Sequence, residues 1–302
     1  MSFLDRAPLL PHLGNGVSTE YGAAASPGAL DVLALRDHTP RYASFLEVGV
    51  EVIKGLDWHT RDWIERGLPT TYHFLDINLD EPSDMDAPWL AEVRAIADRL
   101  QPAWMCGDAG LWHFGQRDRG HMLLLPPILS DANATAMAEG IARLRAETGF
   151  EVLPENPPST VYLGDLHILE YFARVCDRAD TGMLLDCAHL AIYQRLAGHE
   201  PTTALDDFPL DRVIEIHIAG GKASNHEGFG FIEDSHTPDV LDDTWTIMER
   251  VVSRAPNLKA VVFECERNSA AVCLPGFARI EEILHRNAVA PSFRGSAVRS
   301  PR

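Results

Sequence analysis

Several short apolar runs, far apart in this 302-residue chain, end in a histidine, an aspartate or a glutamate. An apolar run of this length is typical of a buried β-strand. The carboxyl ends of the strands meet at one face of a parallel barrel, where its active site lies. Five such strand ends would direct side chains that commonly bind metals into one volume. This arrangement strongly constrains the fold. The runs are 71–73, 153–156, 183–186, 214–217 and 261–264.

Strands and helices are expected to alternate along the whole chain. This alternation favours a parallel sheet, and eight repeats favour closure into a barrel. We therefore predict an α/β fold, a single-domain (β/α)8 TIM barrel over residues 1–290, with a flexible tail over 291–302. The expected strands are 14–21, 42–49, 70–75, 103–108, 151–156, 182–186, 213–219 and 259–264. The expected helices are 28–38, 57–66, 88–100, 131–148, 166–178, 189–197, 240–255 and 276–287.

Charge and cysteine content narrow the functional classes. The formal net charge of −18 disfavours a nucleic-acid partner, because binding a polyanion relies on lysine and arginine. The five cysteines form no CxxC pair, and an odd count argues against a disulfide framework. No apolar run approaches the ~20 residues of a membrane span, and the N-terminus lacks the pattern of a signal peptide. These features predict a cytoplasmic protein with no membrane partner.

Two connections, 108–129 and 220–239, are longer than usual for this fold, and both are expected at the barrel face that carries active sites. The first contains Asp108 and His113, which are candidate catalytic residues. The second contains Asp234 and His236, whose spacing in an extended segment places carboxylate and imidazole on one side. His189, one helical turn after a strand end, is a third candidate for catalysis.

The candidate metal ligands combine imidazoles with carboxylates and include no thiolate. Strand alternation turns Glu264 and Glu266 inward and Cys265 outward, so the cysteine is expected to pack in the core. Each ligand alone also has a structural explanation, such as an ion pair, but together they suit iron, manganese or zinc. The number of candidate ligands is larger than one metal ion needs. A bridging Glu155 would allow the set to hold two or three ions. The candidates are His73, Glu155, Asp186, His217, Asp234, His236 and Glu264.

Other chemistries have less support. The chain contains no phosphate-binding GxxxxGK[ST] loop, no GxGxxG and no GxSxG elbow. A divalent-metal sugar isomerase or epimerase on the same barrel is the alternative enzyme, since Glu155, Asp186, His217 and Glu264 would suit one or two ions. A non-catalytic metal-binding or peptide-binding scaffold is a third hypothesis.

At these residues the sequence resembles the DUF692 family of multinuclear non-heme iron-dependent oxidative enzymes. The resemblance runs from about residue 14 to about residue 268. It rests on 153–157, like the family's LEN-P segment, and 184–186, like its LLD. It also rests on 217–220, like its HLAG, on 234–236, like its D-T-H, and on 262–264, which is similar to its strand-eight segment.

The resemblance implies a TIM barrel with two or three iron ions and O2 as co-substrate. It implies oxidation of a residue, typically cysteine, in a ribosomally synthesised precursor peptide, which a small partner protein presents. It also implies that the seven candidate ligands bind iron. Two segments depart from the family pattern. The strand-four histidine is replaced at 107–109, where His113 is a possible substitute, and His189 stands after the LLD segment where the family often has asparagines.

Overall fold

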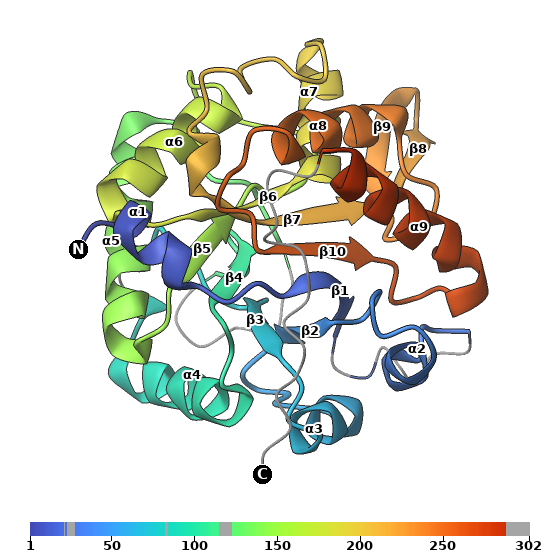
Figure 1. The fold of residues 1–302 in the computed structure, drawn as a ribbon. Coiled ribbons are helices and arrows are strands. Elements are labelled where there is room, and N and C mark those ends of the chain that lie inside the picture. The colour runs from blue at the N-terminus through green and yellow to red at the C-terminus, as the bar shows by residue number, and fades with distance from the viewer. Residues whose placement is uncertain (21, 23–27, 82–83, 115–122, 288–302) are drawn as a thin grey trace.

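A closed barrel of eight parallel strands forms the centre of the computed structural model, which confirms the predicted fold (Figure 1). The structure describes residues 1–20, 22, 28–81, 84–114 and 123–287, so the predicted tail lies outside the described residues. The strands close in the order β1-β10-β7-β6-β5-β4-β3-β2. They are β1 (Gly14–Thr19), β2 (Phe45–Val50), β3 (Thr70–Phe74), β4 (Met105–Asp108), β5 (Val152–Glu155), β6 (Met183–Asp186), β7 (Val213–Ala219) and β10 (Ala260–Glu264).

Helices surround the barrel, and most begin at a polar residue that accepts a backbone hydrogen bond. The side chains of Asp31, Asp57, Asp86 and Ser130 each cap a helix in this way, which satisfies an otherwise unpaired N–H group. None of the described helices is both long and apolar enough to cross a membrane. The helices are α2 (Val32–His38), α3 (Trp58–Glu65), α4 (Ala87–Leu100), α5 (Asp131–Thr148), α6 (Ile168–Ala179), α7 (Cys187–Ala197), α8 (Asp242–Val252) and α9 (Ala270–Arg286).

The barrel interior is apolar at the amino ends of its strands. Phe45, Trp104, Leu153 and other inward residues form one buried cluster, which the N-terminal segment closes from below with Phe3. Phe3 belongs to a short helix that the sequence did not predict, α1 (Phe3–Arg6), followed by a 3-10 turn, η1 (Ala7–Leu9). With this end filled by apolar side chains, most inward polar side chains lie toward the carboxyl ends of the strands.

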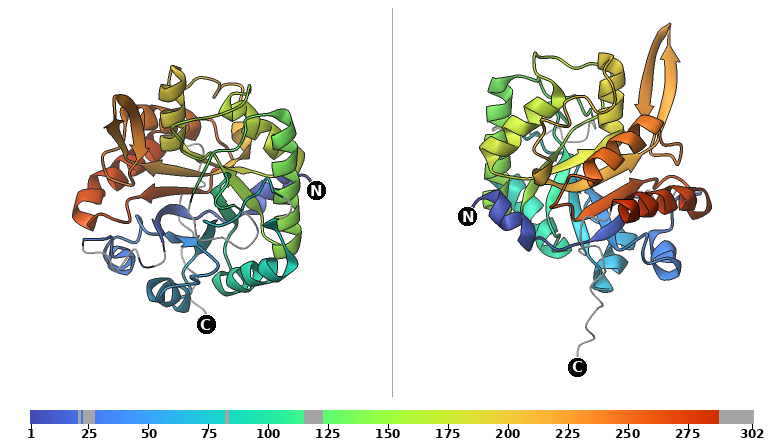
Figure 2. Two further views of the ribbon diagram at one scale, coloured as in Figure 1. Left: turned by 180° about the vertical axis from the view of Figure 1, so that it is seen from behind. Right: turned by 45° about the horizontal axis from the view of Figure 1, so that its top comes forward.

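The connection after β7 contains an antiparallel hairpin, where the sequence predicted only a loop. Strands β8 (Gly221–His226) and β9 (Phe229–Asp234) pair from Gly221 with Asp234 to His226 with Phe229. Figure 2 shows the hairpin projecting from the barrel. Its turn residues Glu227 and Gly228 both have positive φ, of 49° and 90°, as a two-residue type I′ turn requires. A Glu-Gly turn is a weaker sequence signal than Asn-Gly.

Candidate active site

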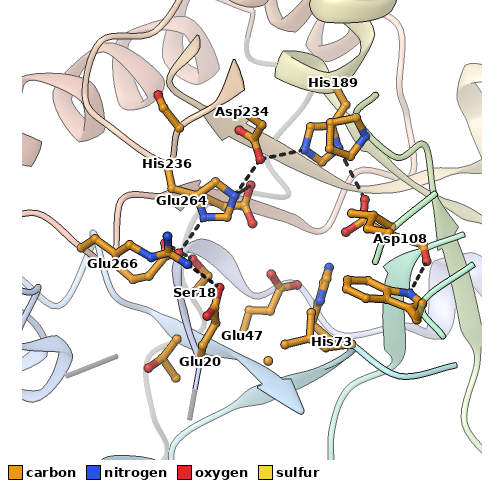
Figure 3. Close-up of a pocket in the computed structure, with 18 residues that line it drawn as sticks. Ser18, Glu20, Glu47, His73, Asp108, His189, Asp234, His236, Glu264 and Glu266 are labelled. Carbon is orange, nitrogen blue, oxygen red and sulfur yellow. Dashed lines mark hydrogen bonds and ion pairs between the residues drawn. The ribbon is translucent and has the colours of Figure 1, made fainter. Parts of the chain in front are cut away.

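The carboxyl ends of the strands bring buried acids and histidines into one pocket of about 280 Å³ (Figure 3). Glu47 on β2, His73 on β3, Asp108 on β4 and Glu264 on β10 all line it. The hairpin and the segment after it add Asp234 and His236, and α7 adds His189, so distant segments of the chain meet here.

Glu155, at the end of β5, lies at the centre of the buried part of the site. Its Oε2 atom is 2.8 Å from His73 Nε2, and its Oε1 atom is 3.3 Å from His217 Nδ1. His189 Nδ1 is 3.6 Å from Oε1. Glu155 is 1% exposed. One carboxylate therefore contacts three imidazoles from three different elements, as a bridging ligand would.

The opposite side of the pocket is built around His236. Its Nε2 atom is 2.9 Å from Asp234 Oδ2 and 3.8 Å from Glu264 Oε2, and its Nδ1 atom is 2.6 Å from Glu266 Oε1. The backbone of His236 has a φ of 46°, which is uncommon outside glycine. Asn268 Nδ2 donates a hydrogen bond of 2.8 Å to the His236 carbonyl and holds this turn. Such a constrained residue beside a polar pocket is typical of a functional site.

His189 connects the two sides. Its Nε2 atom is 3.3 Å from Asp234 Oδ2, and its Nδ1 atom is 3.6 Å from Asp108 Oδ1. The position follows from a local cap, because Asp186 Oδ1 accepts a hydrogen bond of 2.6 Å from the His189 N–H at the start of α7. The other oxygen, Asp186 Oδ2, lies 3.7 Å from His189 Nε2.

Asn156 aligns the ends of β5 and β6. Its side chain donates to the Asp186 carbonyl at 2.9 Å and accepts from the Asp186 N–H at 3.0 Å. The Asn156 carbonyl is 2.9 Å from His189 Nδ1. Asn156 therefore fixes the position of the His189 imidazole relative to Asp186 at the end of β6.

His113 lies apart from the pocket that Asp108 lines. Its Nε2 atom is 3.2 Å from Asp84 Oδ1, and the side chain is 1% exposed. Its neighbour Trp112 lines the pocket instead, with the indole Nε1 donating to the Asp108 carbonyl at 3.1 Å. His113, the possible substitute for the strand-four histidine, therefore lies outside the pocket, whereas His189 lies among the acids.

Glu47 and Glu266 also belong to the site, although neither was predicted as a ligand. Glu47 Oε1 is 3.1 Å from His217 Nε2, and Glu266 contacts His236. Strand alternation indicated that Glu266 faces inward. The sequence carried a similar signal for Glu47, because a carboxylate within the apolar strand Phe45–Val50 is buried whichever face of the strand it occupies. Beneath it, Glu215 Oε2 accepts a hydrogen bond of 2.6 Å from Trp104 Nε1.

Burial and charge pairing together determine the protonation of these groups. Burial opposes charge at His73, but the Glu47 carboxylate and the hydrogen-bonded Glu155 raise its pKa to about 9. Burial also disfavours a charged Glu155, yet His217 and His73 hold its pKa well below the usual range. At Asp186, burial outweighs the attraction of His189 and raises the pKa to about 8. Without metal, the site is a network in which imidazoles compete for protons with acids.

A comparison with family models identifies the family of this chain. Residues 30–283 match the model of the family described as RiPP precursor modification enzyme MbnB/TglH/ChrH, where RiPP denotes a ribosomally synthesised and post-translationally modified peptide. The chain belongs to this family. Membership of the MbnB/TglH/ChrH family confirms the DUF692 resemblance that the motifs indicated. It also supports catalysis, since the family is one of enzymes.

Relatives of this MbnB/TglH/ChrH family member are UPF0276 proteins. A UPF0276 protein of Caulobacter vibrioides is 26% identical over 238 residues, covering 74% of this chain and 83% of the relative. A UPF0276 protein of Acaryochloris marina is 26% identical over 204 residues, covering 66% of this chain and 71% of the relative.

Solved structures show the same barrel. A xylose isomerase-like TIM barrel protein from Mycobacterium smegmatis, in complex with magnesium, superposes with a TM-score of 0.57 at 12% identity, covering 93% of this chain and 98% of that one. A xylose isomerase domain protein from Planctomyces limnophilus gives a TM-score of 0.55 at 9% identity, covering 92% and 99%. At this identity the likeness concerns the fold alone.

Proposed function

We propose that this enzyme is a multinuclear non-heme iron oxidase that uses O2 to modify a cysteine of a ribosomally synthesised precursor peptide. The observation that carries the proposal is the buried set of imidazoles and carboxylates at the barrel mouth, in a member of a precursor-modifying family. A small partner protein that presents the peptide is part of the same proposal.

The site residues fit a group of metal ions. Among the described residues, Asp108 Oδ1, Asp186 Oδ2, Asp234 Oδ1 and Glu264 Oε2 are buried without a hydrogen-bond partner. Burying a carboxylate oxygen without a hydrogen bond is costly unless a cation compensates it. Carboxylates also outnumber imidazoles in the site, so even four protonated histidines leave negative charge uncompensated. The acids are Glu47, Asp108, Glu155, Asp186, Asp234, Glu264 and Glu266, and the histidines are His73, His189, His217 and His236.

The geometry favours more than one ion. Glu47 with His73 and His217 forms one ligand group, and Glu155 with Asp186 and His217 forms another. Glu155 also groups with His73 and Asp108, so it is shared between candidate positions. We assign His73, Glu155, Asp186, His217, Asp234, His236 and Glu264 to two or three iron ions. Bound iron would supply one-electron reduction of O2 and Lewis-acid binding of a thiolate.

The residues of the chain prepare the pocket for such chemistry. Trp112 and Leu124 add apolar surface to the lining of the pocket, beside the acids. Asp108 and His189 lie beside the ligands, and we assign them to catalysis as groups that hold or move a proton near the bound thiol. Glu266 orients the His236 ring by accepting at its Nδ1 atom, an arrangement that stabilises metal-binding histidines.

A sugar isomerase or epimerase remains the alternative. It is supported by the barrel fold and by the donor set, which would also suit Mn²⁺ or Mg²⁺. The family match favours the peptide-modifying oxidase instead.

Metal analysis tests the proposal. Protein purified without oxygen from iron-supplemented cells is expected to contain two or three irons per chain, with a coupled signal in Mössbauer or EPR spectra. It should consume O2 when a cysteine-containing peptide is added. A single Mn²⁺ or Zn²⁺ per chain, with turnover of a sugar and none of a peptide, would establish the alternative.

Substituting each of the two histidines is expected to separate their roles. His189→Ala should lower both iron content and peptide oxidation by about tenfold or more, because the imidazole lies among Asp108, Glu155 and Asp234. His113→Ala should keep the iron content of the wild type and lower the thermal unfolding midpoint. Metal analysis and calorimetry on both variants measure the difference. Loss of iron in His113→Ala but not in His189→Ala would reverse the assignment.

A further inference from the structure

A second cavity, of about 290 Å³, lies between the projecting hairpin, α7 and the connection that follows β5. Its lining is mainly apolar, with Ile192 and Leu196 from α7 and Ile232 from β9. Strand β9 lies against α7 along this cavity. The candidate active site accounts for none of these residues, so the cavity requires its own explanation.

Two of the segments that line the second cavity, α7 and β9, also line the active site. On α7, His189 lines the active site, and Ile192 and Leu196, three and seven residues later, share its helical face and line the cavity. On β9, Asp234 lines the active site. Gly230 lies four residues earlier, on the same face of the strand, and lines the cavity.

The connection after β5 is the third segment that lines both cavities. Pro158 lines the active site, and the next two residues, Ser159 and Thr160, line the second cavity. Three separate segments therefore pass from one cavity to the other. We call the surface that these three segments line, from the metal-binding residues to the second cavity, the groove.

We propose that this groove binds the stretch of the precursor peptide next to its reacting residue and selects an apolar side chain there. The inference rests on the proposed function. Seven residues of α7 span about 10 Å, and four residues of β9 span about 13 Å. An extended peptide advances about 3.3–3.6 Å per residue, so the selected side chain lies about three or four residues from the reacting one.

The chemistry of the lining supports an apolar preference. Among the described residues of this lining, Arg195 is the one cation, and it is paired with Asp243. The Ser159 hydroxyl is engaged within its own loop by Val161. Leu196 is 41% exposed, which leaves apolar surface for a ligand to cover. A Cβ atom built at Gly230 would meet only Asn225, at 4.0 Å, so a peptide backbone has room to approach this strand.

A binding selection tests the groove without requiring turnover. The probe is a synthetic peptide library with one central cysteine and about five varied residues on each side, enough to span the groove in either direction. Peptides retained by immobilised, metal-loaded protein are sequenced by mass spectrometry. We expect about tenfold enrichment of leucine, isoleucine, valine and phenylalanine three or four residues from the cysteine, on one side only.

Variants locate the effect. Leu196→Asp should abolish the enrichment and Ile232→Ala should weaken it, with metal content unchanged in both. Val272→Asp is the matched control, because Val272 is 53% exposed on α9 and lies outside the groove. No positional preference in the wild type, or a preference that survives Leu196→Asp, would overturn the proposal. Failure of the oxidase proposal would show separately, as absent iron or absent O2 consumption.

Discussion

Replacing Glu155 with glutamine is expected to remove at least one iron per chain and to reduce peptide oxidation by more than about a hundredfold. Among the carboxylates of the site, Glu155 contacts the most imidazoles, with His73, His217 and His189 all within 3.6 Å. A glutamine retains the size of the side chain but supplies one neutral oxygen in place of a bridging carboxylate. The metal positions that share Glu155 should therefore lose affinity for iron together.

Glu151→Gln is the matched control for this substitution. Glu151 lies four residues earlier, at the amino end of β5 and away from the metal ligands, and binds Arg6 at 2.6 Å. It should leave iron content unchanged, although it should cost some stability. The measurement is iron per chain by elemental analysis, together with the initial rate of O2 consumption. Wild-type iron content in Glu155→Gln would contradict the bridging role.

The metal-free protein is expected to lose stability as the pH rises from about 6.5 to about 9. In that state the pKa of His73 is raised from 6.5 to about 9 by the surrounding carboxylates. Since the folded pKa exceeds the unfolded one, the stabilisation is complete below pH 6.5 and is lost as the pH rises through 9. The groups that face His73 are Glu47, Asp108, Glu155 and His217.

The expected size of this loss is about 3 kcal/mol from His73 alone, which would lower the unfolding midpoint by several degrees. Asp186 contributes in the same direction, because its folded pKa of about 8 lies above its unfolded value and favours the folded state at lower pH. Calorimetry in the presence of a chelator measures the effect across this pH range.

Metal loading provides the control for this prediction. Cations displace protons from the histidines, so the stability of the loaded protein should vary much less over the same pH range. His73→Gln in the metal-free state should also reduce the slope. An unchanged midpoint between pH 6.5 and 9 in the metal-free wild type would contradict the account of the charge network.

The sequence predicted the barrel because the local signals agreed with one another. Helix α5 begins and ends as expected, since Ser130 caps its first turn and Gly149 ends it in the left-handed conformation. Helix α9 begins at Ala270 rather than 276, and Pro275 lies inside it. The hairpin β8–β9 was missed, since its Glu-Gly turn and exposed strands give little apolar signal.

For the candidate site, the sequence by itself determined which strand ends carry metal-type side chains. That inference needs only short segments of sequence, because side chains alternate along a strand and the carboxyl ends of parallel strands meet at one face. His73, Glu155 and His217 are examples. Only the tertiary structure decided between the two further histidines, because packing brings His189 to Asp108 and Asp234, whereas His113 lies beside Asp84 and outside the pocket. The groove between α7 and the hairpin is likewise a tertiary feature, since its walls come from segments that no periodicity relates, and packing alone brings them together.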